Sequence, residues 1–312
     1  MAKKIFIDGK AGTTGLRIFE RLENFEGIEI ITLSEEKRKD ITARKEALNS
    51  ADIAFLCLPD DAARESVSLI ENDNTVVIDT STAHRTDEAF AYGFPELSAL
   101  HREKLQNSKR IAVPGCHASG FIALIFPLIE SGILNKNENL SCFSLTGYSG
   151  GGKKMIAEYE DSERDELLDA PRQYGLTQQH KHLKEMKAIS GIENAPAFCP
   201  IVAPFYSGME VTVPLFKNML KSGTTIEDIK NIYKEKYQGP IVNFKENNDE
   251  SGFISAGAFS GADTMEISVF GNEDRIILTA RYDNLGKGAS GAAIECLNIV
   301  LGQDETTGLV IK

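Results

Sequence analysis

Paired cysteines, an excess of basic residues and long apolar runs are all missing from this 312-residue sequence. The five cysteines form no Cys-x-x-Cys pair, so neither a disulfide framework nor a zinc cluster is predicted, and a reducing compartment fits best. A formal net charge of -12 gives no concentrated basic face for a nucleic acid. No stretch reaches the roughly 18 uncharged apolar residues of a membrane span, and "MAKKIFIDGK" has no signal-peptide core. We therefore expect a cytoplasmic globular protein with no metal site and no nucleic-acid or membrane partner.

Short apolar runs alternate with amphipathic segments through the first third of the chain. "KKIFID", "IEIITL", "DIAFLCLP" and "TVVIDTS" are separated by "GLRIFERLENF", "KEALNSA" and "DDAARESVSLIEN". This alternation predicts a parallel sheet with crossover helices, which is an α/β fold of the Rossmann type. From about residue 140 the apolar runs lengthen and the loops between them grow, which predicts a second domain with a mixed or antiparallel sheet.

Glycines recur at a three-residue spacing where the first predicted strand meets the first predicted helix. Such glycines let the backbone turn tightly and approach a pyrophosphate, whose charge is met by free N–H groups at the helix N-terminus. A plain strand-helix turn is the alternative, and the position on the first strand of an α/β pattern favours the dinucleotide. The predicted cofactor-binding residues of this loop are Gly9, Gly12, Thr13, Thr14 and Gly15.

The end of the second predicted strand bears on the choice between NAD and NADP. An NAD site has an acidic residue here for the ribose 2'-hydroxyl, whereas a 2'-phosphate requires a small polar residue and a cation. In "IEIITLSEEKRKD" we place Ser34 at the strand end, followed by Lys37 and Arg38. This arrangement favours NADP, although Glu35 and Glu36 leave a solvated charge run as the alternative.

Cys116 lies in "VPGCHASGFIALIFPL", between a Pro-Gly turn and an apolar run with helical spacing. A helix N-terminus stabilises a thiolate because unpaired N–H groups and the positive end of the dipole favour negative charge. We therefore predict Cys116 to be a nucleophile, and Cys57, Cys142 and Cys296 to be core residues.

A nucleophilic thiol needs a proton-transfer partner, and "YGLTQQHKHLKEM" supplies His180 and His182. These two side chains would face opposite sides of a helix but the same side of an extended segment, so the local structure decides whether both reach one site. His117 is expected to point away from the site.

Two further segments carry candidate substrate residues. Gly147, Gly152 and Lys153 in "TGYSGGGKK" match a phosphate-loop spacing, but the next position is Lys154 where Ser or Thr would hold magnesium. We therefore interpret this segment as a substrate loop in which Ser149, Gly150 and Lys153 line the pocket. Arg85, in "STAHRT", is a candidate for the leaving phosphate, with a structural ion pair as the alternative.

Seven segments in this order, "DGKAGTTG", "IDTSTAHRT", "YGFPEL", "VPGCHASG", "TGYSGGGKK", "QHKHLKE" and "YDNLGKGASGAA", closely resemble the shorter type of N-acetyl-gamma-glutamyl-phosphate reductase. The resemblance covers nearly the whole chain. It implies a Rossmann-like NADP-binding domain over 1–115 plus 285–312, and a glyceraldehyde-3-phosphate dehydrogenase-like catalytic and oligomerisation domain over 116–284. It also implies a homo-oligomer, either a dimer or a tetramer.

The resemblance implies that the Cys116 thiolate attacks an acyl phosphate, that phosphate leaves, and that NADPH reduces the thioester to N-acetyl-L-glutamate 5-semialdehyde in arginine biosynthesis. His180 or His182 would be the acid-base group, Tyr174 would bind substrate, and Asn284 and Gly286 would approach the nicotinamide.

Two alternatives remain open from the residues. One is the same chemistry on another acyl phosphate, such as aspartyl phosphate or a carrier-linked aminoadipyl phosphate. The other is a cofactor-binding thiol hydrolase or regulatory module with no net redox chemistry.

Overall fold

The computed structural model describes residues 2–23 and 25–312 of the chain. The chain divides into two compact units, one of Met1–Pro114 and Ala289–Leu309, the other of Gly115–Gly288 and Val310–Lys312. The boundaries predicted from sequence differ from this division at residue 115, at 285–288 and at 310–312. The nucleophile candidate Cys116 thus belongs to the second unit, one residue after that unit begins.

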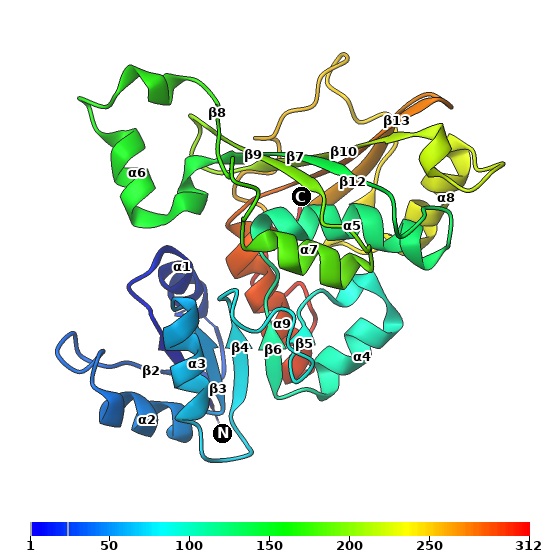
Figure 1. The fold of residues 1–312 in the computed structure, drawn as a ribbon. Helices are drawn as coiled ribbons and strands as arrows, with labels where there is room; N and C mark the ends of the chain where they lie inside the picture. Colours follow the sequence, from blue (N-terminus) through cyan, green and yellow to red (C-terminus); the bar gives the residue numbers. More distant parts are fainter. Residues whose placement is uncertain (1, 24) are drawn as a thin grey trace. The chain divides into compact units, whose positions relative to one another are not determined.

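The first unit is a parallel six-stranded sheet in the order β2-β1-β3-β4-β6-β5, flanked by helices (Figure 1). Its strands are β1 (Lys3–Asp8), β2 (Ile28–Ile31), β3 (Ile53–Leu56), β4 (Val76–Asp79), β5 (Ala91–Tyr92) and β6 (Arg110–Ala112). Its helices are α1 (Thr13–Leu22), α2 (Ile41–Ser50), α3 (Asp60–Ser68), the 3-10 turn η1 (Pro95–Leu97), α4 (Ala99–Asn107) and, from the far end of the sequence, α9 (Gly291–Leu301). The predicted Rossmann-like α/β fold is confirmed.

Strand β1 lies at the point where the strand order reverses, because the chain runs from β1 to β2 on one side and then to β3 on the other. Open α/β sheets bind ligands outside the carboxyl ends of the strands at such a point. Gly9 follows β1 with a φ of +88°, and a Cβ there would lie 2.3 Å from the carbonyl oxygen of Cys57. A Cβ on Gly15 would lie 2.5 Å from the carbonyl oxygen of Gly9. Both glycines are therefore required by this turn.

Helix α9 completes the core of the first unit. Its Ile294 and Leu297 are fully buried and pack in one cluster with Ile5, Ile78 and Ile111 from the sheet. Burying an Ile or Leu side chain contributes roughly 1.5–3 kcal/mol. The first unit therefore depends on a segment that the sequence places after the second.

The second unit is a seven-stranded mixed sheet in the order β11-β12-β13-β10-β7-β9-β8. Its strands are β7 (Ser141–Gly147), β8 (Arg172–Gln173), β9 (Ala197–Ala203), β10 (Met209–Phe216), β11 (Val242–Phe244), β12 (Met265–Gly271) and β13 (Arg275–Tyr282). Its helical segments are α5 (Cys116–Glu130), η2 (Tyr148–Gly151), α6 (Gly152–Glu160), η3 (Glu166–Asp169), α7 (His182–Ser190), η4 (Lys217–Met219) and α8 (Ile226–Lys236); a π-helical turn covers Gly286–Ser290. The predicted mixed sheet is confirmed.

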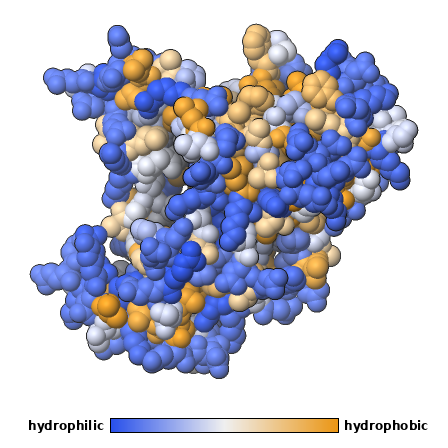
Figure 2. Space-filling view, viewed as in Figure 1, coloured by the Kyte–Doolittle hydropathy of each residue, from blue (hydrophilic) through white to orange (hydrophobic). Residues whose placement is uncertain are grey.

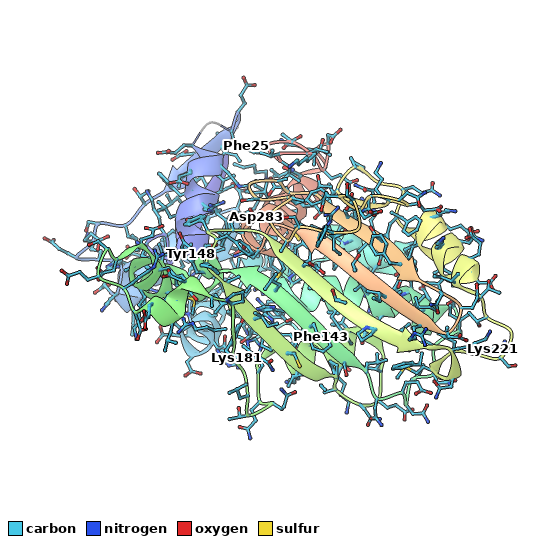
Figure 3. The ribbon with its side chains drawn as sticks, turned by 90° about the horizontal axis from the view of Figure 1, so that it is seen from above. Phe25, Phe143, Tyr148, Lys181, Lys221 and Asp283 are labelled. Atoms are coloured by element: carbon cyan, nitrogen blue, oxygen red, sulfur yellow. The ribbon has the colours of Figure 1, made fainter. Side chains whose placement is uncertain are left out.

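Helices cover one face of this sheet, with α5 packed on β10 and β13 and α8 packed on β12. The opposite face lies in front of the helices in Figure 3, with Phe143 of β7 labelled on it. Phe143 is 46% exposed and Ile277 of β13 is 42% exposed, whereas Cys142 and Ser144 point to the helix side and are buried. The sheet thus has one covered face and one face with exposed apolar side chains.

Hydrophilic residues cover most of the surface visible in Figure 2, broken by small hydrophobic patches. The apolar run after Cys116 forms the 15-residue helix α5, in which Pro127 lies near the C-terminal end. Among the described residues, no helix has both the length and the apolar character to cross a membrane.

Candidate active site

Cys116 is the first residue of α5, directly after the N-cap Gly115, which has an extended backbone (φ -78°, ψ 144°). From Ile111 to Ile125, Cys116 is the residue that remains partly accessible while its neighbours are buried. The first N–H groups of a helix have no partner within the helix, and together with the helix dipole they favour an anion. The fold therefore places an accessible thiol where a thiolate is stabilised.

The other cysteines have different surroundings. Burial raises the pKa of Cys57 to about 12, and burial also raises the pKa of Cys142. Cys296 is fully buried in the core of the first unit. Cys199 is partly exposed on the open face of the second sheet, since it pairs with Phe143 in the strand register. None of these four lies at the start of a helix.

A cluster of aromatic and imidazole rings forms beside Cys116 in the second unit. The ring centroid of His117 lies 5.9 Å from that of His180 and 5.6 Å from that of His182, and the rings of His180 and His182 are 4.8 Å apart. His180 precedes α7 and His182 begins it, so the chain is not a regular helix between them and both rings can face the same cluster. The sequence reasoning left this point open, and the structure brings both histidines together.

His117 is buried, and both of its ring nitrogens are hydrogen-bonded. Nδ1 lies 2.6 Å from the hydroxyl of Ser144 on β7, and Nε2 lies 2.6 Å from the hydroxyl of Tyr174. The expectation that His117 points away from the site is wrong. The sequence did not reveal this position, because the two hydrogen-bond partners of the ring, Ser144 and Tyr174, lie on segments distant from His117 in the chain.

Burial favours the neutral form of two imidazoles of the cluster, His117 and His180. Burial lowers the pKa of His117 to about 3, and the nearby His180 lowers it further. Burial, followed by the charge of Lys181, also lowers the pKa of His180. The backbone N–H of His182 donates to Nδ1 of His180 at 3.2 Å, so a neutral His180 carries its proton on Nε2. Neutral imidazoles near a thiol can accept or relay a proton at ordinary pH.

Tyr174 is bonded to His117 of this cluster, and its pKa is affected by the charge of Cys116. Burial raises the pKa of Tyr174, and the charge of Cys116 raises it further. Tyr174 therefore stays protonated and acts as a neutral hydrogen-bonding group. Glu185 on α7 also contacts the segment that carries the thiol. It is buried, and its Oε1 accepts the backbone N–H of Gly115 at 2.8 Å. The sequence pattern did not predict this contact.

Ser149 and Asn284 form a buried polar pair close to the glycine-rich segment. The side-chain amide of Asn284 donates to the hydroxyl of Ser149 at 3.0 Å, and its oxygen accepts the backbone N–H of Gly208 at 2.9 Å. Gly150 lies against this amide, because a Cβ there would be 3.3 Å from its nitrogen. Lys153, at the start of α6, is exposed. Gly286 is required where it stands, since a Cβ there would lie 2.1 Å from the carbonyl oxygen of Ala262.

A cavity of about 480 Å³ lies in the first unit, at the carboxyl ends of β1 and β2. Gly9 and Arg38 line it, together with Glu35 and Lys39. The amides at the start of α1, from Gly12 to Gly15, follow the turn that borders this cavity. The lining residues thus fit the nucleotide part of a dinucleotide, since they include Gly9 of the turn after β1 and the cations Arg38 and Lys39.

The position of Ser34 differs from the prediction. Strand β2 ends at Ile31, because its pairing with β1 stops there, so Ser34 lies three residues past the strand end. Ser34 is exposed, and its carbonyl accepts the N–H groups of Lys37 and Arg38 in a turn. The lining residue in its place is Glu35, which forms an ion pair with Arg38 at 2.8 Å.

Arg85 is buried in the first unit. Its Nε donates to the carbonyl oxygen of Val113 at 2.9 Å, and Nη2 donates to that of Thr80 at 3.0 Å. These bonds fix the side chain against the loops that follow β4 and β6. Arg85 therefore has a structural role in holding these two loops together.

The chain matches two protein families and has relatives of similar sequence over nearly its whole length. Residues 4–108 match the family described as semialdehyde dehydrogenase, NAD binding domain, and residues 116–284 match semialdehyde dehydrogenase, dimerisation domain. The chain is 43% identical to N-acetyl-gamma-glutamyl-phosphate reductase 2 of a Nostoc species, over 98% of this chain and 99% of the relative. It is also 43% identical to the N-acetyl-gamma-glutamyl-phosphate reductase of Sinorhizobium medicae, over 96% of this chain and 99% of that protein.

Solved structures of similar fold are more distant in sequence. Aspartate semialdehyde dehydrogenase II of Vibrio cholerae superposes with a TM-score of 0.71 at 16% identity, covering 97% of this chain and 99% of that one. The aspartate semialdehyde dehydrogenase of Francisella tularensis gives a TM-score of 0.70 at 17% identity, covering 96% and 100%. At this identity the likeness establishes the fold.

Because His117 is buried in its neutral form, the free energy of unfolding should depend on pH. An unfolded histidine titrates near ~6.5, whereas folded His117 has a pKa of about 3. As the pH falls below 6.5 the unfolded chain takes up a proton that the folded chain excludes, so this contribution to the unfolding free energy decreases by up to roughly 1.4 kcal/mol per pH unit. We expect His117→Asn to show a smaller decrease between pH 7 and pH 4.5 than the wild type in urea unfolding. His101→Asn on α4 is the control, and equal slopes in all three proteins would contradict the assignment.

Proposed function

The chain belongs to the N-acetyl-gamma-glutamyl-phosphate reductase family, and we propose that it reduces N-acetyl-L-glutamyl 5-phosphate to N-acetyl-L-glutamate 5-semialdehyde with NADPH, in arginine biosynthesis. The observation that carries this proposal is the partly accessible Cys116 thiol at the N-terminus of a buried helix, in the same unit as a cluster of three histidine rings. The bound nicotinamide dinucleotide would supply the hydride.

The residues of the second unit account for the covalent steps. The Cys116 sulfur bonds to the acyl carbon as the bond from that carbon to the phosphate oxygen breaks, so phosphate leaves and a thioester forms. A thioester carbonyl is less resonance-stabilised than a carboxylate and accepts hydride more readily. The resulting oxyanion then expels the thiolate to give the aldehyde. Backbone N–H groups at the start of α5 are suitable donors to the oxyanion.

We propose His180 or His182 as the acid-base group that manages the proton at Cys116. Both rings lie in the cluster. A neutral His180 carries its proton on the nitrogen that does not accept the N–H of His182. The hydrogen bond to His117 orients Tyr174, which we propose as a substrate contact. Ser149, Gly150, Lys153 and Arg85 remain proposed substrate contacts, and Asn284 and Gly286 remain proposed contacts of the nicotinamide.

We propose NADP as the cofactor, with Arg38 as the cation for the 2'-phosphate. Arg38 lines the nucleotide cavity, but Glu35 neutralises it in this structure. A 2'-phosphate would take the place of the Glu35 carboxylate on the guanidinium, a bidentate contact that a 2'-hydroxyl cannot replace. Ser34 stays a proposed neighbour of this site, and Gly9, Gly12, Thr13, Thr14 and Gly15 a proposed pyrophosphate loop.

The second unit has a surface suited to self-association. Phe143 and Ile277 expose their side chains on the sheet face without helices, and Cys199 lies on the same face. Apolar side chains gathered on an open sheet face are typical of protein interfaces. We propose that this face joins two copies of the chain, and that the assembly is a dimer or a tetramer.

The cysteines support a reducing location. All five are free thiols, and Cys116 is partly accessible. Accessible thiols persist in reduced form where glutathione and thioredoxin maintain them. We therefore propose the cytoplasm as the site of action.

Replacing Cys116 by serine tests the proposed function directly. We expect Cys116→Ser to keep its fold and cofactor affinity but to lose turnover by about 10³-fold or more, because a hydroxyl ionises far less readily than a thiol. The assay follows NADPH formation in the reverse direction, from NADP and phosphate. The aldehyde added is N-acetylglutamate semialdehyde or aspartate semialdehyde, and a reaction without aldehyde is the blank. Cys199→Ser is the matched control, since Cys199 is also partly exposed, and it should keep normal turnover. Near-normal turnover in Cys116→Ser would exclude covalent catalysis at this residue.

The proposed cofactor preference is tested by titrating NADPH and NADH against the protein and following nucleotide fluorescence. We expect tighter binding of NADPH, and Arg38→Gln should weaken NADPH binding by about tenfold, equivalent to ~1.4 kcal/mol, while leaving NADH binding unchanged. Lys37→Gln is the control because Lys37 does not line the cavity. Equal affinity for both nucleotides, or equal effects of the two substitutions, would refute the role of Arg38.

A further inference from the structure

Tyr282, the last residue of β13, places a buried hydroxyl inside the first turn of α5. The residue is fully buried. Its hydroxyl donates to the carbonyl oxygen of Cys116 at 2.5 Å and accepts the backbone N–H of Gly120 at 3.0 Å. An α-helix normally pairs these two backbone groups, at i and i+4, with each other. The tyrosine therefore bridges the opening turn of the helix that carries the nucleophile.

Gly120 makes room for this hydroxyl. A Cβ at position 120 would lie 2.7 Å from the Tyr282 oxygen and 2.6 Å from the side chain of Val211 on β10. Contacts this close do not occur for real side chains, so only glycine permits both the helix and the tyrosine to occupy this place.

The segment after Tyr282 is fixed independently of the helix. The carboxylate of Asp283 accepts four hydrogen bonds, from the backbone N–H groups of Leu285, Gly286 and Gly261 and from the hydroxyl of Ser207. Asp283 is labelled in Figure 3. The strand end is thus held in one position, and the hydroxyl with it.

The same segment contacts Cys116 a second time. A Cβ on Gly288 would lie 3.1 Å from the Cβ of Cys116 and 3.4 Å from its Cα, so the backbone of Gly288 packs directly against the nucleophile. The hydroxyl of Tyr282 on one side and Gly288 on the other restrict where the Cys116 backbone can lie.

We propose that Tyr282 is a positioning residue for the Cys116 thiol, because its hydroxyl sets the geometry of the first turn of α5 and thereby the direction of the N–H groups that stabilise the thiolate. The inference rests on the proposed role of Cys116 as nucleophile. Without the oxygen, the Gly120 N–H and the Cys116 carbonyl lose the partner that they share, so the first turn of α5 can relax and the thiol moves relative to its donors.

The protonation state of Tyr282 supports this role. Burial raises its pKa well above 10, and the charge of Cys116 raises it further. The phenol therefore remains a hydrogen-bond donor to the Cys116 carbonyl over the whole range in which the thiol titrates.

The chain offers a matched control on the same helix. Tyr237, after α8, is buried, and its hydroxyl donates to the carbonyl oxygen of Ala123 in α5 at 2.7 Å. Tyr237→Phe removes the same kind of bond to the same helix, two turns away from the thiol. A purely structural role for Tyr282 would give both substitutions the same consequences.

The test measures alkylation of Cys116 by iodoacetamide between pH 5 and pH 10, with the Cys116 peptide quantified by mass spectrometry. We expect Tyr282→Phe to shift the rate profile to higher pH, so that the rate at pH 7 falls by about tenfold, the change that one pH unit produces below the midpoint. Tyr237→Phe should keep the wild-type profile even if its thermal stability falls equally. A profile for Tyr282→Phe that is unchanged or shifted to lower pH would overturn the inference.

The wild-type profile separates this inference from the proposed function. If Cys116 in the wild type reacts no faster than the free thiol of N-acetylcysteine at the same pH, the proposed nucleophile itself is wrong. If Cys116 is selectively reactive but Tyr282→Phe matches Tyr237→Phe, the nucleophile stands and the role of Tyr282 falls.

A second variant applies if Tyr282→Phe does not fold. Gly120→Ala puts a methyl group against the hydroxyl and should shift the alkylation profile in the same direction. Val211→Ala, which loosens the other contact of Gly120 without touching the hydroxyl, is its control and should keep the wild-type profile. An unchanged profile in Gly120→Ala would overturn the inference.

Discussion

The proposed site depends on one interaction, the stabilisation of a Cys116 thiolate by the N-terminus of α5. A helix terminus provides that stabilisation only if the helix begins at the reactive residue and the surroundings are dry enough for its dipoles to act. The structure meets both conditions, since α5 begins at Cys116 and almost every residue of its first three turns is buried. The close packing of α5 on β10 and β13, with Gly120 at the contact, follows from the same requirement.

The histidine cluster has a related physical basis. Burial that strengthens electrostatic interactions around the thiol also removes protons from nearby imidazoles, as the lowered pKa of His117 shows. A neutral His117, bonded to both Ser144 and Tyr174, can orient the tyrosine but cannot provide a positive charge to the thiolate. In the proposed mechanism the two tasks are therefore separate: the helix stabilises the negative charge, and His180 or His182 moves the proton.

The sequence was sufficient to predict the fold class and the position of Cys116 at the start of a helix, because both leave local signals. Alternating apolar runs specify a parallel sheet, and a Pro-Gly turn before an apolar helix marks a helix N-terminus. Ser34 was placed wrongly because the length of β2 depends on its pairing with β1, which no local pattern reveals. His117 was expected to point away from the site, and Tyr282 was not singled out, for a similar reason: their partners lie on segments that are distant in the chain.

The most direct test of the account is to trap the covalent intermediate. Incubating the protein with N-acetylglutamate semialdehyde and NADP, with phosphate left out, forms the thioester by the reverse reaction and leaves it no acceptor except water. Rapid acid quenching and peptide mass spectrometry should then find one N-acetylglutamyl group per chain, attached to Cys116, together with an equal amount of NADPH. NADPH formation without an adduct on Cys116, or an adduct on another residue, would contradict the account.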